Sequence, residues 1–412
     1  MKKPIFLVGV ALIFMFAFNS CNKDTNVLDL DKTLKFTKLT VEEQKTSIEQ
    51  NAIDLVNKMD GIQQTEGFVA LTHLATMTIN SSQPVYLVPF RQLRADLLKN
   101  DLKTLDNFTR QMRVAKNVGD SIWGEWNWNS TYGEFTLAKN LTNTAIFHFP
   151  SDSTSTSNDA TLTIIYVEST IAAPDTDPVE YMPSSISVVL KVGTTEALKA
   201  TFSGSYNADA TPTKLSQTLT IDKYSWSADL SNDKKNVSAT YEFKYDTETL
   251  LKYQLGAAGN FTESVLNDST SHPQDIITSG SMYFQVFNIA MLGGFKDFKA
   301  FGDEMDVIDG QKNSDKDRVT KQVAAINKYL KMYAYFVKEN QKFADIEFYV
   351  VEKTETDYSN YNFNTGQYGT MTYYDIQPRL VLSDGSKQDM ETFVNTGFED
   401  LINRLNELQP MN

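Results

Sequence analysis

The sequence is poor in the residues that most often build metal, redox and nucleophile sites. It contains one cysteine, so no disulfide can form within the chain. The three histidines, His73, His148 and His272, lie in separate segments, and none has a partner one helical turn away, so no zinc site is expected. Neither a phosphate-binding glycine loop nor a G-x-S-x-G motif occurs. We therefore expect no metal and no cofactor, and we favour a role without catalysis.

Basic residues are also scarce relative to acidic ones. The chain has 38 Lys and Arg against 52 Asp and Glu, a net charge of −14. A surface of this sign repels the phosphate backbone, so nucleic acid is not expected as a partner. The hydrophobic content of 41% and the aromatic content of 12% are sufficient for packed cores and exclude disorder along the whole chain.

The N-terminus has the organisation of a secretory signal peptide. Lys2 and Lys3 precede an apolar run over 4–18, and the small Ser20 stands directly before Cys21. The run is shorter than the roughly 20 residues that a membrane-spanning helix needs. We therefore predict that residues 1–20 are a cleaved signal peptide. The alternative is a soluble secreted protein in which the cysteine has no such role.

The Ser20–Cys21 junction resembles the lipobox of bacterial membrane lipoproteins. The resemblance implies that the Cys21 sulfur receives a diacylglycerol, that cleavage occurs before Cys21, and that the new amine is acylated, with palmitate among the chains. Several acyl chains hold a protein on a membrane far more firmly than one chain does. Asn22 in place of Asp implies the outer membrane by the same resemblance. The protein would then face the periplasm or the cell surface.

The rest of the chain predicts an α+β fold with a change of period near residue 119. Residues 21–39 are predicted to be a lipidated tether and 40–118 a helical segment, opened by a Thr40 and Glu43 capping pair. Strict alternation of apolar and polar residues over 119–265 predicts a large antiparallel meander of about eight to ten strands. We expect an open sheet or a half-barrel.

Residues 266–412 are predicted to be a mixed α/β segment. Residues 280–291 alternate in part and predict one strand. Ser314 and Asp317 have capping spacing before an apolar stripe that runs from Val319 to Val337, which predicts one long helix. A strand at 345–351, a hairpin through the turn 383–386 and a C-terminal helix complete the segment.

Two aromatic clusters are candidate binding sites. Trp126 and Trp128 share one face of a predicted strand, where they would form a glycan-stacking platform or, as we favour, fill the core. The nearby Glu125 and Glu134 form a conceivable glycosidase pair. The second cluster, in 357–375, mixes tyrosines with Asn, Gly and Thr, a composition suited to adaptable contacts. We expect a long hairpin loop there, used for binding or laid against the sheet. Its candidate binding residues are Tyr358, Tyr361, Tyr368, Tyr373 and Tyr374.

Three short triplets resemble an O-glycosylation motif of some exported Gram-negative proteins. The candidate acceptors are Ser121, Ser153 and Ser269, each preceded by Asp.

Three functions remain open from the sequence. The leading hypothesis is a lipid-anchored envelope protein with a binding or structural role, whose partner is a glycan or an envelope protein. One alternative is a periplasmic carrier that shelters a lipid or another apolar ligand in a curved sheet. The other is a glycan-active enzyme.

Overall fold

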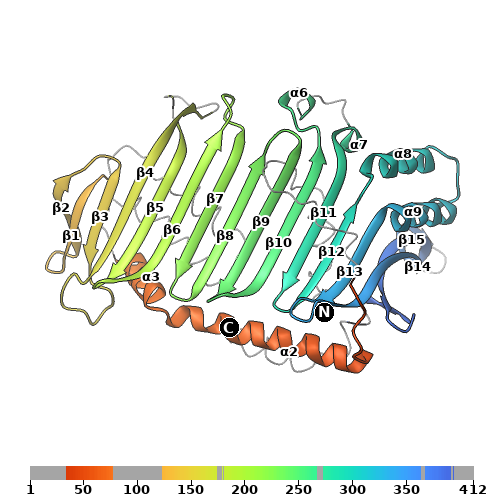
Figure 1. Cartoon of the computed structure of the whole chain (residues 1–412), viewed down its shortest axis with the longest axis horizontal. Helices are drawn as coiled ribbons and strands as arrows, with labels where there is room; N and C mark the ends of the chain where they lie inside the picture. Colours follow the sequence, from red (N-terminus) through yellow and green to blue (C-terminus); the bar gives the residue numbers. More distant parts are fainter. Residues whose placement is uncertain are drawn as a thin grey trace.

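The computed structural model describes residues 34–77, 123–173, 179, 181–266, 272–362, 367–390 and 393. Its strands form one open sheet of 16 strands, in the order β16-β15-β14-β13-β12-β11-β10-β9-β8-β7-β6-β5-β4-β3-β1-β2. Helices flank the sheet at the N-terminal side and near its C-terminal strands (Figure 1). The predicted α+β class is therefore confirmed.

The predicted meander region contains ten strands. They are β1 (Gly124–Asn129), β2 (Glu134–Asn140), β3 (Thr144–Phe149), β4 (Ala160–Ala172), β5 (Tyr181–Val192), β6 (Thr195–Tyr206), β7 (Pro212–Ile221), β8 (Tyr224–Asn232), β9 (Asn236–Tyr245) and β10 (Glu248–Gly259). Neighbouring strands pair antiparallel except β1 and β3, which pair parallel. The alternation works as expected in β9, where Tyr241 and Phe243 are buried and Glu242 lies on the opposite face.

The sheet continues past residue 265 without a break. The later strands are β11 (Ile277–Val286), β12 (Ile289–Phe295), β13 (Leu330–Phe336), β14 (Gln341–Asn362), β15 (Gln367–Leu382) and β16 (Lys387–Asp389). The short helices α6 (Glu263–Leu266) and α7 (Pro273–Ile276) lie between β10 and β11, and α8 (Phe298–Asp309) and α9 (Asp315–Tyr329) lie between β12 and β13. Strands from both predicted segments thus belong to one sheet.

Two predictions in the last third were wrong in detail. The predicted strand over 280–291 is a hairpin, because the chain turns at Phe287 and Asn288 between β11 and β12. The predicted helix to Val337 ends at Tyr329, and β13 follows it directly. Residues 330–336 are rich in β-forming aromatics and pair with β12 and β14 on both sides, so sheet pairing replaces the last helical turns.

The first N-terminal helix begins at the residue that the predicted capping pair indicates. Thr40 and Glu43 form both hydrogen bonds of a capping box at the start of α2 (Val41–Asp60). The 3₁₀ helix η1 (Gly61–Gln64) follows, and Thr65 caps α3 (Glu66–Thr76). Figure 1 shows α2 crossing the lower ends of the strands, with α3 beyond it.

The main core lies between α3, η1 and one face of β1–β10. Leu71 and Leu74 of α3 are buried there with Leu162, Ile164 and other strand residues. Close packing needs a glycine at the start of α3, because a Cβ on Gly67 would lie 2.1 Å from the carbonyl oxygen of Ala197 in the sheet. A second cluster joins β13–β15 to the first half of α2.

Residues 34–39, at the end of the predicted tether, lie against the sheet. The Thr37 amide donates to the carbonyl of Lys342, and the Lys342 amide donates to the carbonyl of Lys35. Leu34 packs with Leu292 and Tyr333. The chain is therefore already attached to the sheet before α2 begins.

Several predicted elements lie outside the described residues. These are the signal peptide with Cys21, the part of the predicted helical segment over 78–118, and the C-terminal helix. Among the helices that the structure describes, none is long and apolar enough to cross a membrane.

Candidate functional site

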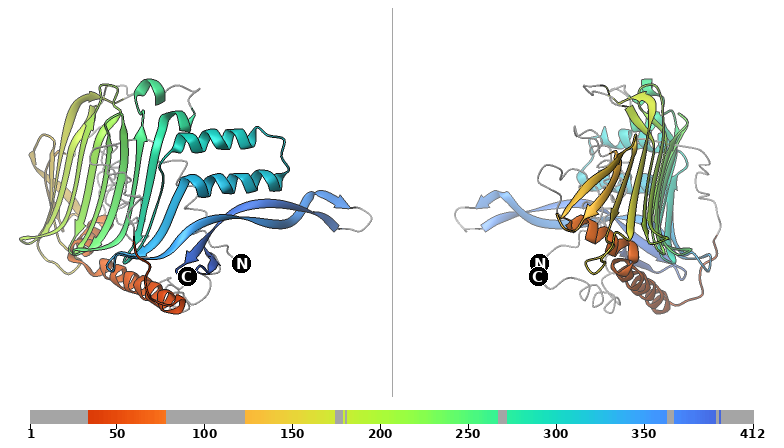
Figure 2. Two further views of the ribbon diagram at one scale, coloured as in Figure 1. Left: turned by 45° about the vertical axis from the view of Figure 1, so that its right-hand side comes forward. Right: turned by 90° about the vertical axis from the view of Figure 1, so that its left-hand side faces the viewer.

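The most distinctive feature is a two-stranded arm formed by residues 350–362 of β14 and 367–376 of β15. β13 pairs with β14 only as far as Ile346, and β16 pairs with β15 only over 379–381. Over the arm, β14 and β15 pair with each other alone among the described strands. Figure 2 shows the two strands running beyond α8 and α9 and away from the sheet.

The predicted loop over 357–375 is therefore mainly strand. Tyr361 pairs with Tyr368, which leaves a short connection over 363–366 outside the described residues. The segment is rich in Tyr and Thr, which favour strands. Isolated two-stranded ribbons are marginally stable in water. At the base of the ribbon α9 lies beside both strands, and Lys316 Nζ is 4.0 Å from Glu352 Oε2. Beyond that contact the ribbon extends toward its tip as an exposed pair of strands, which is the geometry of an interaction surface.

One face of the arm combines aromatic rings and hydroxyl groups. Its tip holds Tyr358 and Tyr368, whose ring centroids lie 5.2 Å apart at an interplanar angle of 60°. The exposed fractions of these residues are 78% and 47%. Four threonines, opposite one another in two pairs, continue the same face toward the sheet: Thr356, Thr370, Thr354 and Thr372.

The opposite face carries charges that are paired within the arm. Lys353 Nζ lies 2.6 Å from Asp375 Oδ2, and the Tyr373 hydroxyl donates to Glu355 Oε1 at 2.7 Å. The hydrogen bond with Asp375 raises the pKa of Lys353, and the bond to Glu355 raises the pKa of Tyr373. Both side chains therefore stay protonated at neutral pH and hold the two strands together across this face.

The five predicted tyrosines thus have different environments. Tyr358 and Tyr368 form the exposed pair, and Tyr373 is bound to Glu355 on the other face. Tyr374 lies at the base of the arm, where Lys316 Nζ of α9 is 5.5 Å from its ring centroid. The backbone of Tyr361 is described and its side chain lies outside the described part. The tip pair is the accessible portion of the predicted site.

The tryptophan cluster lies in the core rather than on an open platform. Trp126 has an exposed fraction of 8% and stacks on Phe147, with ring centroids 6.4 Å apart. Trp128 is half-buried and makes an edge contact with Phe135 at 5.2 Å. Both belong to or pack against the main core cluster. These positions agree with the core alternative for the tryptophans.

The two candidate glycosidase carboxylates lie apart. Glu125 faces Lys139, whereas Glu134 faces Asn129, four residues further along β1. At about 3.3 Å per residue the separation is roughly 13 Å, whereas glycosidases hold their carboxyl groups about 5 to 10 Å apart. This geometry does not favour a glycosidase that uses this pair.

Glu125 instead contacts a histidine on the sheet, which sequence reasoning missed. His148 Nε2 lies 3.1 Å from Glu125 Oε1, and His148 Nδ1 lies 3.1 Å from Thr161 Oγ1. Strand register alone brings the three together, because they come from β1, β3 and β4. Among the described residues no group of three or more His, Cys, Asp and Glu side chains is arranged to hold a metal ion.

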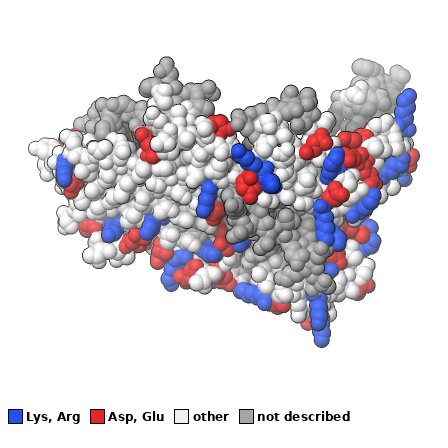
Figure 3. Space-filling model, turned by 45° about the horizontal axis from the view of Figure 1, so that its top comes forward, with Lys and Arg blue, Asp and Glu red and all other residues white. Residues whose placement is uncertain are grey.

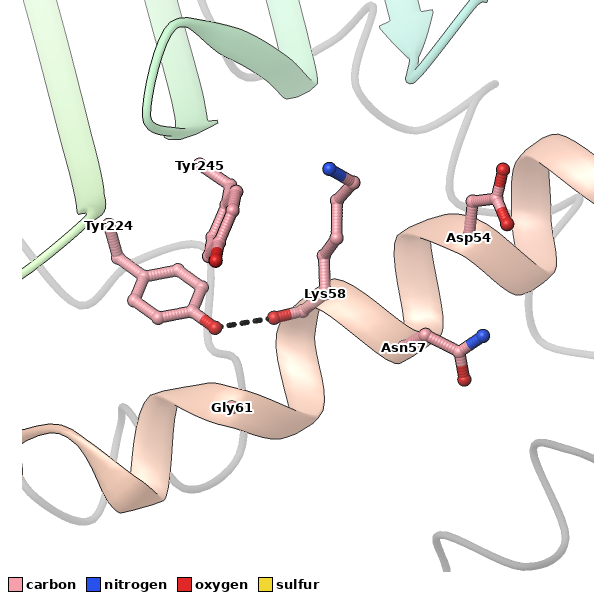
Figure 4. A pocket seen from close by; sticks show the side chains of 6 residues that line it. All are labelled: Asp54, Asn57, Lys58, Gly61, Tyr224 and Tyr245. Atoms are coloured by element: carbon pink, nitrogen blue, oxygen red, sulfur yellow. Dashed lines mark hydrogen bonds between the residues drawn. The ribbon is translucent and has the colours of Figure 1, made fainter.

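An open hollow of about 350 Å³ lies where α2 meets the lower edge of the sheet (Figure 4). Figure 4 shows the Tyr224 hydroxyl donating to the Lys58 carbonyl, a bond of 2.6 Å. Lys58 Nζ lies 2.7 Å from Glu248 Oε2 and 4.9 Å from the centroid of the Tyr245 ring. The hollow is lined by Asp54, Asn57, Lys58, Gly61, Tyr224 and Tyr245. Its open shape and its paired cation indicate a helix-docking joint rather than an enclosed pocket for an apolar ligand.

Glu248 is the central charge of this joint. Partial burial raises its pKa, but hydrogen bonds from Lys338 and Lys58 and their positive charges outweigh burial, so the net shift is downward. We expect Glu248→Gln to lower the free energy of unfolding by about 1 kcal/mol at neutral pH. A lowered carboxyl pKa stabilises the fold above the ordinary glutamate pKa, and this contribution is lost as the pH falls through the lowered value.

The urea stabilities of the wild type and of Glu248→Gln should therefore begin to converge as the pH falls below the ordinary glutamate pKa of about 4.3, and they should coincide only below the lowered pKa of Glu248. Glu196→Gln is the matched control, because the Glu196–Lys199 contact is longer, at 3.7 Å, and more exposed. An equal loss of stability in both variants would contradict a docking role for Glu248.

Of the three candidate glycosylation serines, one lies within the described part of the chain. Ser153 is exposed in the loop between β3 and β4, where Asp152 accepts hydrogen bonds from the amides of Thr154 and Ser155. Ser121 and Ser269 lie outside the described residues.

Charged side chains gather at the end of the molecule that carries α8 and α9, whereas much of the surface over the central strands is uncharged in Figure 3.

In comparisons with protein-family models, curated proteins and solved structures, no match to this chain was found.

Proposed function

We propose that the protein is a lipid-anchored envelope protein with a binding role, and that the tip of the arm is its contact surface. The observation that carries this proposal is the exposed Tyr358–Tyr368 pair on a ribbon that projects from the sheet. Exposed tyrosines bury a large area at low entropic cost and are frequent at binding hot spots. Cys21 provides the membrane anchor by its resemblance to the lipobox cysteine.

The remaining described features support binding more than catalysis. The acidic pair Glu125 and Glu134 is widely separated along the strands. The Glu125–His148–Thr161 contact lies on the face of the sheet opposite the buried residues of β3 and β4, without a described cleft over it. A catalytic site is normally concave and shields its reacting groups from water.

The carrier alternative has less support from the described residues. Among the described residues, α3 packs on β5 and β6, and large side chains such as those of Tyr166 and Phe149 are fully buried on the inner face of the sheet. The hollow beside Lys58 is open, and tyrosine rings as well as charged and amide groups line it. An apolar carrier needs an enclosed apolar cavity, so the binding role remains our leading proposal.

The proposal can be tested by site-specific photo-crosslinking in the native envelope. A photoreactive phenylalanine analogue at position 358 is expected to form a discrete adduct with a partner. The Tyr368→Ser substitution should weaken that adduct about 10-fold, because a buried aromatic contact contributes on the order of 1 to 2 kcal/mol. Melting temperatures should stay unchanged, since both rings are exposed.

Tyr132 is the matched control position. It lies between β1 and β2, far from the arm in the strand order, and its exposed fraction is 75%. The same analogue at position 132 should give no discrete adduct. The proposed contact surface is wrong if position 358 gives no adduct, or if positions 132 and 358 give the same one.

A further inference from the structure

Along the arm, β14 has an outer edge, where its backbone amide and carbonyl groups point away from β15. At the base, Asn327 of α9 occupies this edge: its side-chain amide donates to the Phe348 carbonyl and its carbonyl accepts from the Phe348 amide, both at 2.8 Å. The Phe348 backbone groups therefore point away from β15. Because backbone direction alternates along an antiparallel pair, those of Val350, Glu352, Thr354 and Thr356 point the same way.

No described strand pairs with this edge beyond Ile346. α9 lies beside β14 as far as Glu352, whose Oε2 is 4.0 Å from Lys316 Nζ, so the part of the edge beyond α9 begins near Thr354. The edge of β15 is better protected at its base. Pro378, directly opposite Phe348, has no amide hydrogen to offer, and the Ile376 amide donates to the side chain of Asp375 at 2.8 Å. Over 350–356, β14 contains no proline and no glycine. An edge of this kind is a template for another strand.

We propose that this edge pairs antiparallel with the same edge of a second copy of the chain, about a two-fold axis at Thr354. The inference deepens the proposed function, on which it rests, because it names a partner for the arm. In this register Thr354 faces Thr354 of the second copy, and Glu352 faces Thr356. The outward backbone groups of both copies then meet and form a four-stranded sheet across the two arms.

Charge selects this register over its neighbours. With the axis at Thr354, Lys353 of each copy lies opposite Glu355 of the other, so two opposite-charge pairs form. An axis at Glu352, Lys353 or Glu355 would place that charged residue directly opposite the same residue of the second copy. An axis at Thr356 would place Glu355 opposite Asp357. Like charges directly opposite one another destabilise strand pairs.

The symmetry also closes the assembly. A two-fold pairing uses the same surface on both copies and leaves no further copy of that edge free, so a dimer forms rather than a filament. In this register Tyr358 faces Val350 of the second copy, whereas Tyr368 lies on β15, the outer strand of the four-stranded sheet, and stays available to a partner. Two tips on one dimer would bind a repeated or membrane-fixed partner with a higher effective concentration.

The test compares two proline variants in the full chain carrying Cys21→Ala. Thr354 of β14 and Thr372 of β15 face each other across the arm. The backbone groups of Thr354 point to the outer edge of β14, and those of Thr372 point to the outer edge of β15. Thr354→Pro removes both hydrogen bonds at the proposed axis, and Thr372→Pro makes the same change on the β15 edge. By sedimentation equilibrium we expect a dimer for the Cys21→Ala reference and for Thr372→Pro. The dimer Kd should rise at least about 10-fold for Thr354→Pro.

Hydrogen exchange of the reference protein gives a second readout. The amides of Glu352, Thr354 and Thr356 should become protected as the protein concentration rises through the dimer Kd, while the amide of Thr372 should not. If both proline variants are monomeric, this exchange pattern decides whether the β14 edge is the interface. A monomeric reference, or protection confined to the β15 edge, would overturn the inference. Either result together with a position-358 adduct to a different protein would leave the proposed function intact.

Discussion

Replacing Cys21 by alanine is expected to move the protein from the membrane fraction to the soluble fraction. The expectation follows from the lipobox resemblance, because the sulfur of Cys21 would carry the lipid. Each buried methylene contributes about 0.8 kcal/mol, so the loss of several acyl chains removes nearly all membrane affinity. Ultracentrifugation of lysed cells, followed by a carbonate wash, measures the distribution. Incorporation of an alkyne-labelled palmitate should also be lost.

Ser20→Ala is the matched control for this experiment. Alanine is as small as serine, so the cut site is preserved, and the variant should remain in the membrane fraction with its label. A Cys21→Ala protein that stays in the washed membranes would show that the anchor lies elsewhere in the chain.

Replacing Leu74 by alanine is expected to lower the free energy of unfolding by about 2 to 5 kcal/mol. Leu74 has no exposed surface and lies in the main core between α3 and the sheet. Its truncation removes apolar contacts and leaves a cavity that the helix has little freedom to fill, since Gly67 already lies close to the Ala197 carbonyl. Urea unfolding followed by tryptophan fluorescence would measure the loss.

Val69→Ala on the same helix is the control for Leu74→Ala. Val69 is exposed, so its truncation should change the free energy of unfolding by no more than about 0.5 kcal/mol. Any gain in helix propensity from alanine acts in the stabilising direction. Similar losses in both variants would contradict the packing of α3 described above.

Local sequence signals were sufficient to predict a helix start, a strand or a turn where one physical cause dominated. The capping pair at Thr40 and Glu43 marked the start of α2, and Ser314 marked the start of α9, because the side chains that satisfy free amides are adjacent in sequence. Alternation marked the strands of the meander, because the apolar residues of one face are buried in the main core. The turn at 383–386 placed the last hairpin correctly.

Other features depended on what the chain meets in space. The apolar stripe from Val319 to Val337 suits a helix throughout, yet its second part becomes β13 because β12 and β14 lie on either side. The Tyr-rich segment was expected to be a loop, and its strands form because each pairs with the other over a long register. The contact of Glu125 with His148 likewise needs the register of β1 and β3.

Composition and contacts between near neighbours were thus enough to predict the α+β class and the starts of α2 and α9. Three-dimensional packing was needed to show that the described strands join one sheet, that Trp126 and Trp128 lie in or against the core and that the Tyr358–Tyr368 pair projects on an arm. Strand pairing links residues distant in the chain, and the choice between a buried and an exposed ring depends on what covers that face.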